Sequence, residues 1–183
     1  VPTHTIAQRI QEIARVGDRV RVIAGAAPEG FVPPFDAAER RGGLSLPERY
    51  VVVHGTWDSV SDGFRGALAA GAHAVVLDAA EGTEPRYSDI ASSAGLAESR
   101  VHVRGALDTS DRAAVLAGAA AFVASSPTAA WPWRAVEAMR LGVPVVGVDS
   151  GTHRDVLADG GLLVDAGDTH HRSEEHTSEL QSR

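Results

Sequence analysis

The stretch from Ala119 to Val148 constrains the fold more than any other part of the chain. It combines an apolar run, a small polar loop, a segment with helical spacing and a second apolar run, at residues 121–124, 125–130, 131–141 and 145–148. Gly142 and Pro144 stand where a helix is expected to end. The pattern predicts a βαβ unit whose strands are covered on both faces and run parallel.

Similar alternation extends over residues 49–168. We expect further strands at 50–54, 74–77, 101–103 and 161–164, and helices at 59–70, 87–96, 110–117 and 152–157, with Ser110 or Thr109 as an N-cap. This spacing implies a doubly wound α/β fold with a parallel sheet and right-handed crossovers. Ligands bind outside the carboxyl ends of such strands, where a helix N-terminus also offers free N–H groups to a phosphate. We expect the loop at 125–130 on that rim.

The first 48 residues have a different pattern. Apolar spacing predicts a helix over 5–16, and alternation of charged and apolar residues predicts a short strand over 19–24. Residues 25–46 are rich in glycine, proline and charge, which predicts a long connection. Because Val1 is not methionine and the chain opens directly into helix-like sequence, we interpret the chain as the inside of a longer protein.

Composition argues against several functional classes. The net charge is -7 and there is no basic run, which argues against a nucleic-acid partner. The chain has no cysteine, so it has neither disulfides nor thiolate metal sites, and its histidines do not cluster at metal-ligand spacing. No apolar run approaches the ~20 residues of a membrane span, and no signal peptide is visible. Neither a nucleotide-binding glycine motif at 30–55 nor a hydrolase nucleophile elbow is present.

The C-terminal residues differ in style from the rest of the chain. Residues 172–183 are polar and charged, whereas the sequence before them is rich in alanine, glycine and valine. This string resembles the conceptual translation of a sequencing adapter, and a natural charged helical tail is the alternative. We therefore treat residues 169–183 as an artefactual or disordered tail and leave them out of the fold prediction.

Five short motifs follow one another along the second half of the chain. They lie at residues 103–107, 116–126, 136–146, 149–156 and 160–165. In this order and spacing they resemble the C-terminal half of the retaining glycosyltransferases with the GT-B fold, of the family four type. The resemblance implies a Rossmann-like domain at 49–168 that holds a nucleotide-sugar donor, an interdomain crossing segment at 1–48 and a separate N-terminal acceptor domain outside this chain.

The resemblance also implies where the donor binds. Arg104 and Gly105 stand where the family holds the base, and a plain strand-to-helix turn with glycine at positive φ is the alternative. Glu137 matches the glutamate that binds the ribose, and a solvated helix glutamate is the alternative. The predicted substrate-binding set is completed by Gly55, Thr56, Ala130, Trp131 and Arg134.

The first departure from the family pattern lies before the predicted ribose glutamate. The family has a second glutamate eight positions earlier, which contacts the donor sugar, whereas this chain has Ala129. A glycine-rich turn is replaced by residues 130–133, which contain Trp131 and Trp133. These tryptophans could reshape the sugar pocket, or they could pack at a domain interface.

The second departure concerns the phosphates. The family carries basic residues after its first strand, whereas residues 54–63 contain none and include Asp58 and Asp62. Two missing cations could cost several kcal/mol of transition-state stabilisation, on the order of a few per charge-assisted contact. Arg65 and Arg134 are candidate substitutes, and ordinary exposed arginines are the alternative.

The resemblance implies transfer of a hexose from a nucleotide-diphosphate sugar to an acceptor hydroxyl, with retention and without a metal or other cofactor. We expect no turnover by the isolated chain, because the acceptor half of the cleft is missing. The alternative is a non-catalytic relative that binds a partner subunit or a glycan; an epimerase on the same fold has no specific support. We expect a cytoplasmic location. A peripheral place on the inner membrane face is common in such enzymes, but no basic amphipathic helix indicates one.

Overall fold

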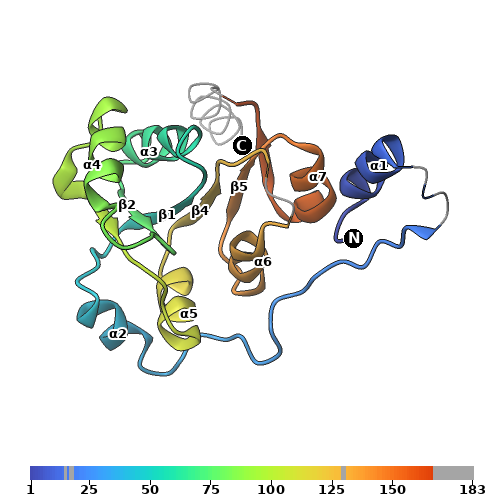
Figure 1. The fold of residues 1–183 in the computed structure, drawn as a ribbon. Helices are drawn as coiled ribbons and strands as arrows, with labels where there is room; N and C mark the ends of the chain where they lie inside the picture. The colour runs from blue at the N-terminus through green and yellow to red at the C-terminus, as the bar shows by residue number, and fades with distance from the viewer. Residues whose placement is uncertain (15, 17–18, 129–130, 167–183) are drawn as a thin grey trace, which may run out of the picture.

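One parallel sheet organises the molecule (Figure 1). The structure is a computed structural model and describes residues 1–14, 16, 19–128 and 131–166. The described strands are β1 (Tyr50–His54), β2 (His73–Val76), β3 (Val101–Val103), β4 (Ala121–Ala124), β5 (Val145–Val148) and β6 (Leu162–Val164). They form a six-stranded sheet in the order β3-β2-β1-β4-β5-β6, with every neighbouring pair parallel. The predicted α/β doubly wound fold is confirmed.

Helices cover both faces of this sheet. The helices on the sheet are α3 (Val60–Ala69), α4 (Glu84–Ser93), α5 (Thr109–Ala117), α6 (Trp133–Arg140) and α7 (Gly151–Leu157). Two more helices, α1 (His4–Ile13) and α2 (Ala37–Gly43), pack on α7 and α5, and η2 (Glu98–Arg100) and η3 (Ala158–Gly160) are short 3₁₀ turns. A strand exposes successive side chains to opposite faces, so a strand buried on both sides must be apolar throughout. Strand β1 shows this directly: Tyr50 and Val52 belong to one core cluster, and Val51 and Val53 belong to the other.

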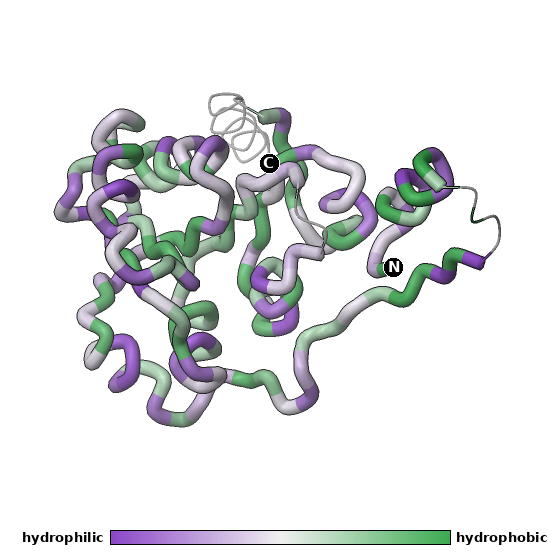
Figure 2. The backbone as a smooth tube through the Cα atoms, viewed as in Figure 1, coloured by the Kyte–Doolittle hydropathy of each residue, from purple (hydrophilic) through white to green (hydrophobic). Residues whose placement is uncertain are grey.

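The two core clusters lie on opposite faces of the sheet. One is completed by α5, α6 and α7, and the other by α3 and α4. Apolar residues accordingly follow the central strands, while polar residues gather on the outer helix surfaces (Figure 2). Phe31, from the connection before α2, also belongs to the first cluster and is only 2% exposed. The segment before β1 is therefore packed into the same core.

The strands predicted within residues 49–168 coincide with the observed ones to within one residue. The helices differ more: α1 ends three residues before the end of the predicted 5–16, and α4 lies three residues earlier than the predicted 87–96 at both ends. The N-cap of α5 is Asp108, whose carboxylate accepts from Asp111 N, so the expectation of Ser110 or Thr109 is wrong. Helix α6 begins at Trp133, two residues later than predicted, because Pro132 precedes it and disfavours helical backbone in the residue before itself. Gly142 has φ +73°, the left-handed conformation expected just after a helix.

The strand predicted over 19–24 is wrong. Residues 20–24 have no regular secondary structure, and Ile23 is 74% exposed. Their backbone instead pairs with the N-terminus: Ile23 N donates to Val1 O, and the Val1 amino group donates to Arg21 O, both at 2.8 Å. Without a neighbouring sheet edge, alternation of charged and apolar residues has no buried face to specify a strand.

The long connection predicted over 25–46 contains helix α2. This helix is short and has two glycines at its C-terminus, so its sequence pattern is weak. Arg40 pairs with Asp36 one turn earlier at 2.8 Å and with Asp111 of α5 at 2.7 Å. Contacts with α5, more than helix propensity, therefore hold α2 in place.

Within the described ranges, no helix is long and apolar enough to cross a bilayer. The predicted tail at 169–183 lies outside the described residues, as do Ala129 and Ala130.

Candidate functional site

The order of the strands reverses between β1 and β4, and their carboxyl ends meet at one rim. His54 at the end of β1 pairs with Ala124 at the end of β4. In open α/β sheets this switch point is where two loops diverge and leave a crevice for a ligand. The fold thus places the loops after β1 and β4 where the sequence predicted a ligand.

Gly55 allows these two loops to approach closely. A Cβ added at Gly55 would lie 2.1 Å from Ser125 Oγ and 2.9 Å from Ser59 Oγ, so no larger residue fits without a shift. Ser125 fastens the loops together, because its backbone N and its Oγ both donate to His54 O, at 2.9 and 3.2 Å. The predicted site residue Gly55 is therefore required by the packing of the rim itself.

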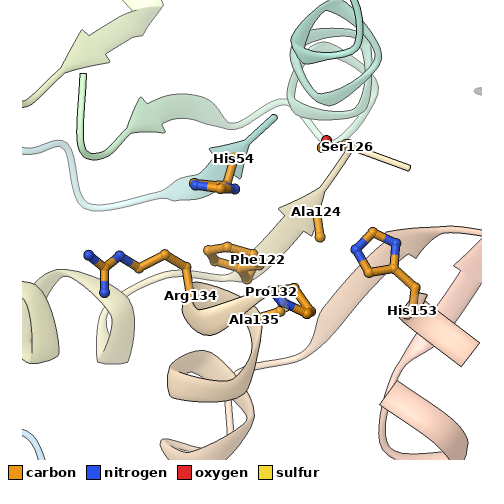
Figure 3. Close-up of a pocket in the computed structure, with 8 residues that line it drawn as sticks. All are labelled: His54, Phe122, Ala124, Ser126, Pro132, Arg134, Ala135 and His153. Atoms are coloured by element: carbon orange, nitrogen blue, oxygen red, sulfur yellow. The ribbon is translucent and has the colours of Figure 1, made fainter. Parts of the chain in front are cut away.

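A cavity opens beside this rim (Figure 3). Its empty volume is about 220 Å³, counting the part that is open to solvent. The lining side chains come from β1, β4, α6, α7 and the loop before α6: His54, Phe122, Ala124, Ser126, Pro132, Arg134, Ala135 and His153. The cavity combines apolar walls with two imidazoles and one guanidinium.

Glu137 lies on the second turn of α6 and is buried, with only 3% of the residue exposed. Two arginines compensate its charge. Arg112 Nε lies 3.1 Å from Oε2 and 3.3 Å from Oε1, and an Nη of Arg134 lies 2.9 Å from Oε2. The two shorter contacts are both with Oε2, so Oε1 keeps acceptor capacity. The glutamate is not a solvated helix residue.

Arg134 is held between two carboxylates. It contacts Asp78, in the loop after β2, through two nitrogens at 2.6 and 3.2 Å, and it contacts Glu137 at 2.9 Å. Its side chain extends from α6 toward the strand that carries His54 (Figure 3). By contrast, Arg65 pairs with Asp62 at 2.9 Å on the surface of α3 and is about half exposed. Of the two candidate substitute cations, only Arg134 lines the cavity.

Arg104 is engaged with the backbone beside it. Its Nε and an Nη donate to Leu44 O, just after α2, and its other Nη donates to Val103 O at 2.7 Å. The neighbouring Gly105 is exposed, and its φ is not positive, so the alternative explanation of a positive-φ turn is wrong. Any recognition of a base here falls to the backbone of residues 104–107, because the Arg104 guanidinium is occupied.

Thr56 closes the loop after β1 on itself. Its backbone N and its Oγ1 both contact Ser59 Oγ, at 3.1 and 3.0 Å, and its carbonyl accepts from Val60 N at the start of α3. Thr56 is exposed. Its side chain therefore shapes the loop, and its position at the rim follows from that loop.

Trp131 and Trp133 form an edge-to-face pair with ring centroids 6.0 Å apart. The pair packs on Gly25 of the segment before α2, where an added Cβ would lie 2.8 to 2.9 Å from atoms of both rings. This contact joins the loop before α6 to the N-terminal segment of the same chain, and Trp133 remains 52% exposed. Of the predicted site, Ala130 cannot be placed, because it lies outside the described residues.

Sequence reasoning missed two histidines and one arginine at the site. His54 stacks on Phe122 with ring centroids 6.3 Å apart, and burial lowers its pKa against the opposing effect of Asp78. His153 is 1% exposed and its Nδ1 lies 2.7 Å from Val148 O, an arrangement that assigns the proton to Nδ1. A histidine at the last position of a buried strand was the available signal for His54. Arg112 had no such signal, because its partner Glu137 lies 25 positions away.

Metal ligation has no support at this rim. Over the ranges that the structure describes, no three histidine, aspartate or glutamate side chains lie close enough together to hold an ion.

Comparisons with known proteins agree with this geometry. Residues 68–180 match the family model described as glycosyl transferases group 1. No curated protein sequence matches the chain. Among solved structures, the sucrose-phosphate synthase tll1590 from Thermosynechococcus elongatus has a TM-score of 0.72 at 21% identity over 100% of this chain and 48% of its own.

Two further structures show which part of a glycosyltransferase this chain resembles. Alr3699/HepE from Anabaena, solved with UDP and glucose, has a TM-score of 0.72 at 21% identity and covers 92% of this chain and 49% of its own. The C-terminal domain of the group 1 family protein LpcC from Francisella tularensis has a TM-score of 0.60 at 16% identity, with 86% of each chain covered. The chain thus spans about half the length of the larger relatives and has the fold of a GT-B C-terminal domain. It belongs to the group 1 glycosyltransferase family.

Proposed function

We propose that the chain is the donor-binding domain of a retaining glycosyltransferase that moves a hexose from a nucleotide-diphosphate sugar to an acceptor hydroxyl. The observation that carries the proposal is the buried Glu137 carboxylate on the helix that starts at the switch-point rim. The family match and a structural relative solved with UDP and glucose support it. In this proposal residues 49–168 hold the donor, residues 1–48 cross from an acceptor domain, and the reaction takes place in the cytoplasm without a metal.

The carboxylate has the chemistry that a ribose requires. A ribose presents two hydroxyl donors, and a carboxylate accepts without supplying a competing proton. Among the residues that the structure describes, Glu137 Oε1 has a single contact, with Arg112 Nε at 3.3 Å, which leaves acceptor sites for a hydroxyl. Desolvation makes such a hydrogen bond stronger than it would be at the surface.

The diphosphate requires positive charge, because the leaving group gains negative charge in the transition state. Arg134 is the arginine that lines the cavity, and it would turn from Asp78 toward the phosphates. Backbone N–H groups at the start of α6 would add to this charge. A single arginine replaces two family cations in this arrangement, so we expect slow transfer.

A non-catalytic binding module is the second candidate. The observation that favours it is the tryptophan pair, whose rings pack on Gly25 before the helix that carries Glu137. A domain that keeps the fold and uses this region to bind a partner subunit or a glycan would need no second glutamate at position 129.

Donor binding separates these two candidates. Calorimetric titration of the chain with UDP-, GDP- and ADP-glucose should give binding for one of them, and Glu137→Gln should weaken that binding by about tenfold or more, equivalent to about 1.4 kcal/mol. Arg65→Gln is the matched control. It removes the other candidate phosphate-binding arginine, which pairs with Asp62 on the surface of α3. Failure of all three donors to bind at millimolar concentration would favour the binding module.

The isolated chain should bind a donor but transfer no sugar, because no acceptor site is present in the proposed half of the cleft. A radiolabelled-sugar assay with the 183-residue chain checks this expectation. Measurable transfer to an added acceptor would contradict it.

A further inference from the structure

Arg112 joins three segments that meet behind the proposed donor site. It lies on the first turn of α5, and 13% of its side chain is exposed. Its Nε contacts both oxygens of Glu137, and an Nη donates to Leu107 O at 3.1 Å. Its guanidinium also lies over the ring of Phe31, 5.7 Å from the centroid. A single side chain thus connects α6, the loop after β3 and the segment before α2.

We infer that Arg112 is a positioning residue for the donor nucleoside. It holds the Glu137 carboxylate at a fixed place relative to the loop at 104–107, so that a ribose and its base would find both contacts already formed. This inference rests on the proposed function. It assigns to Arg112 a role that acts through Glu137 and through the Leu107 carbonyl, without contact between Arg112 and the ligand.

The exposure and the partners of Arg112 and Arg134 differ in a way that supports this role. Arg134 is nearly twice as exposed as Arg112, at 23% against 13% of the side chain, and it shares its charge with Asp78. A buried carboxylate that loses its last cation is strongly destabilised. Because Arg112 stays on Glu137, Arg134 can leave for a diphosphate without exposing the carboxylate to that penalty.

The geometry requires an arginine. The guanidinium is planar and presents donors in fixed directions, so Nε can face the carboxylate while an Nη faces the Leu107 carbonyl. A lysine would keep the charge but would offer one compact ammonium group at the end of a flexible chain. The N-cap of α5 adds to the rigidity, since the Asp108 carboxylate accepts from Asp111 N and Asp108 O accepts from Arg112 N, both within 2.9 Å.

The test compares ribose and deoxyribose nucleotides. UDP, GDP and ADP are titrated into the chain, and the tightest of them is compared with its 2′-deoxy analogue. We expect the wild-type chain to prefer the ribonucleotide by about tenfold, because Glu137 loses a hydroxyl partner in the deoxy ligand. Arg112→Gln should reduce that ratio to about one, and Arg112→Lys should reduce it nearly as much while keeping the charge.

Two controls separate positioning from folding. Arg41→Gln removes an arginine that donates to the Ala114 carbonyl of the same helix α5, and it should leave the ratio unchanged. Arg134→Gln should weaken both nucleotides equally, because both carry the same diphosphate. Far-ultraviolet circular dichroism of each variant confirms folding, and Arg112→Lys carries the test if Arg112→Gln does not fold.

The outcomes distinguish the inference from the function on which it rests. If the wild-type chain binds a nucleoside diphosphate and both Arg112 variants keep its ribose preference, the positioning role is wrong and the proposed function stands. If the wild-type chain binds none of the three nucleoside diphosphates, both are wrong. If the preference for the ribonucleotide falls in both Arg112 variants and is unchanged in Arg41→Gln, the positioning role of Arg112 is supported.

Discussion

The two sides of the switch-point rim differ in chemistry. The loop after β1 contains neither lysine nor arginine over residues 54–63, and Thr56 and Ser59 close it on itself. The side formed by α5 and α6 carries Arg112, Arg134 and a buried carboxylate. Positive charge at the rim therefore comes from α5 and α6, and the first loop contributes close backbone packing. We therefore expect the side formed by α5 and α6 to supply the charge for the proposed donor, and the loop after β1 to supply backbone packing.

Removal of the central carboxylate should have the largest effect. Glu137→Leu leaves Arg112 buried beside an apolar side chain, and we expect a loss of about 3 kcal/mol in the free energy of unfolding, together with loss of donor binding. Urea denaturation and calorimetry measure these two effects. Glu137→Gln is the milder control. A Leu variant as stable as the wild type would show that the α6 side does not depend on this ion cluster.

The loop after β1 should be more sensitive to the size of its side chains than to their charge. Gly55→Ala places a Cβ against Ser125 Oγ and should cost about 1–3 kcal/mol by overpacking. Ser125→Ala removes that oxygen and leaves a 3.4 Å contact with its Cβ, while the 2.9 Å approach to Ser59 Oγ remains, so the double variant should recover part of the loss. Thermal unfolding of the two single variants and the double variant measures the coupling. Strict additivity would contradict the close approach of the two loops.

The pH dependence of the free energy of unfolding should reflect the protonation of His54. Burial lowers its pKa from the ordinary 6.5, so the folded state favours neutral imidazole and the unfolded state binds more protons at acid pH. The folded state therefore keeps its full stability above pH 6.5, and it loses stability as the pH falls through the lowered pKa of His54. His54→Gln should flatten the stability profile below pH 6.5, measured by urea denaturation at stepped pH. An unchanged acid limb would mean that His54 does not titrate differently in the two states.

Replacement of Arg65, the exposed arginine on the β1 side of the rim, should have the smallest effect. Arg65→Gln breaks an exposed i,i+3 pair with Asp62, which is worth at most about 0.5 kcal/mol. Donor affinity should stay within twofold of the wild type in the same titrations. A loss of tenfold would place a phosphate-binding cation on the β1 side after all and remove the contrast between the two sides.

The sequence alone determined the elements of the fold. Strands buried on both faces must be mostly apolar runs, and this is why 50–54, 121–124 and 145–148 were predicted with their observed bounds. The N-terminal segment lacks that constraint, so the predicted strand at 19–24 was wrong and α2 was missed. Family motifs indicated Glu137 and Gly55 as site positions, and the structure shows one buried and the other in a close approach.

Tertiary structure alone decided what those positions can do. Glu137 is compensated by Arg112 and Arg134, and Arg134 reaches Asp78, 56 positions away along the chain. The Arg104 guanidinium is likewise taken by the Leu44 carbonyl, 60 positions away. Local sequence encodes backbone periodicity and burial because these depend on near neighbours and on the hydrophobic pattern. The partner of a charged side chain depends on which strands lie side by side, and that order is set only when the whole sheet assembles.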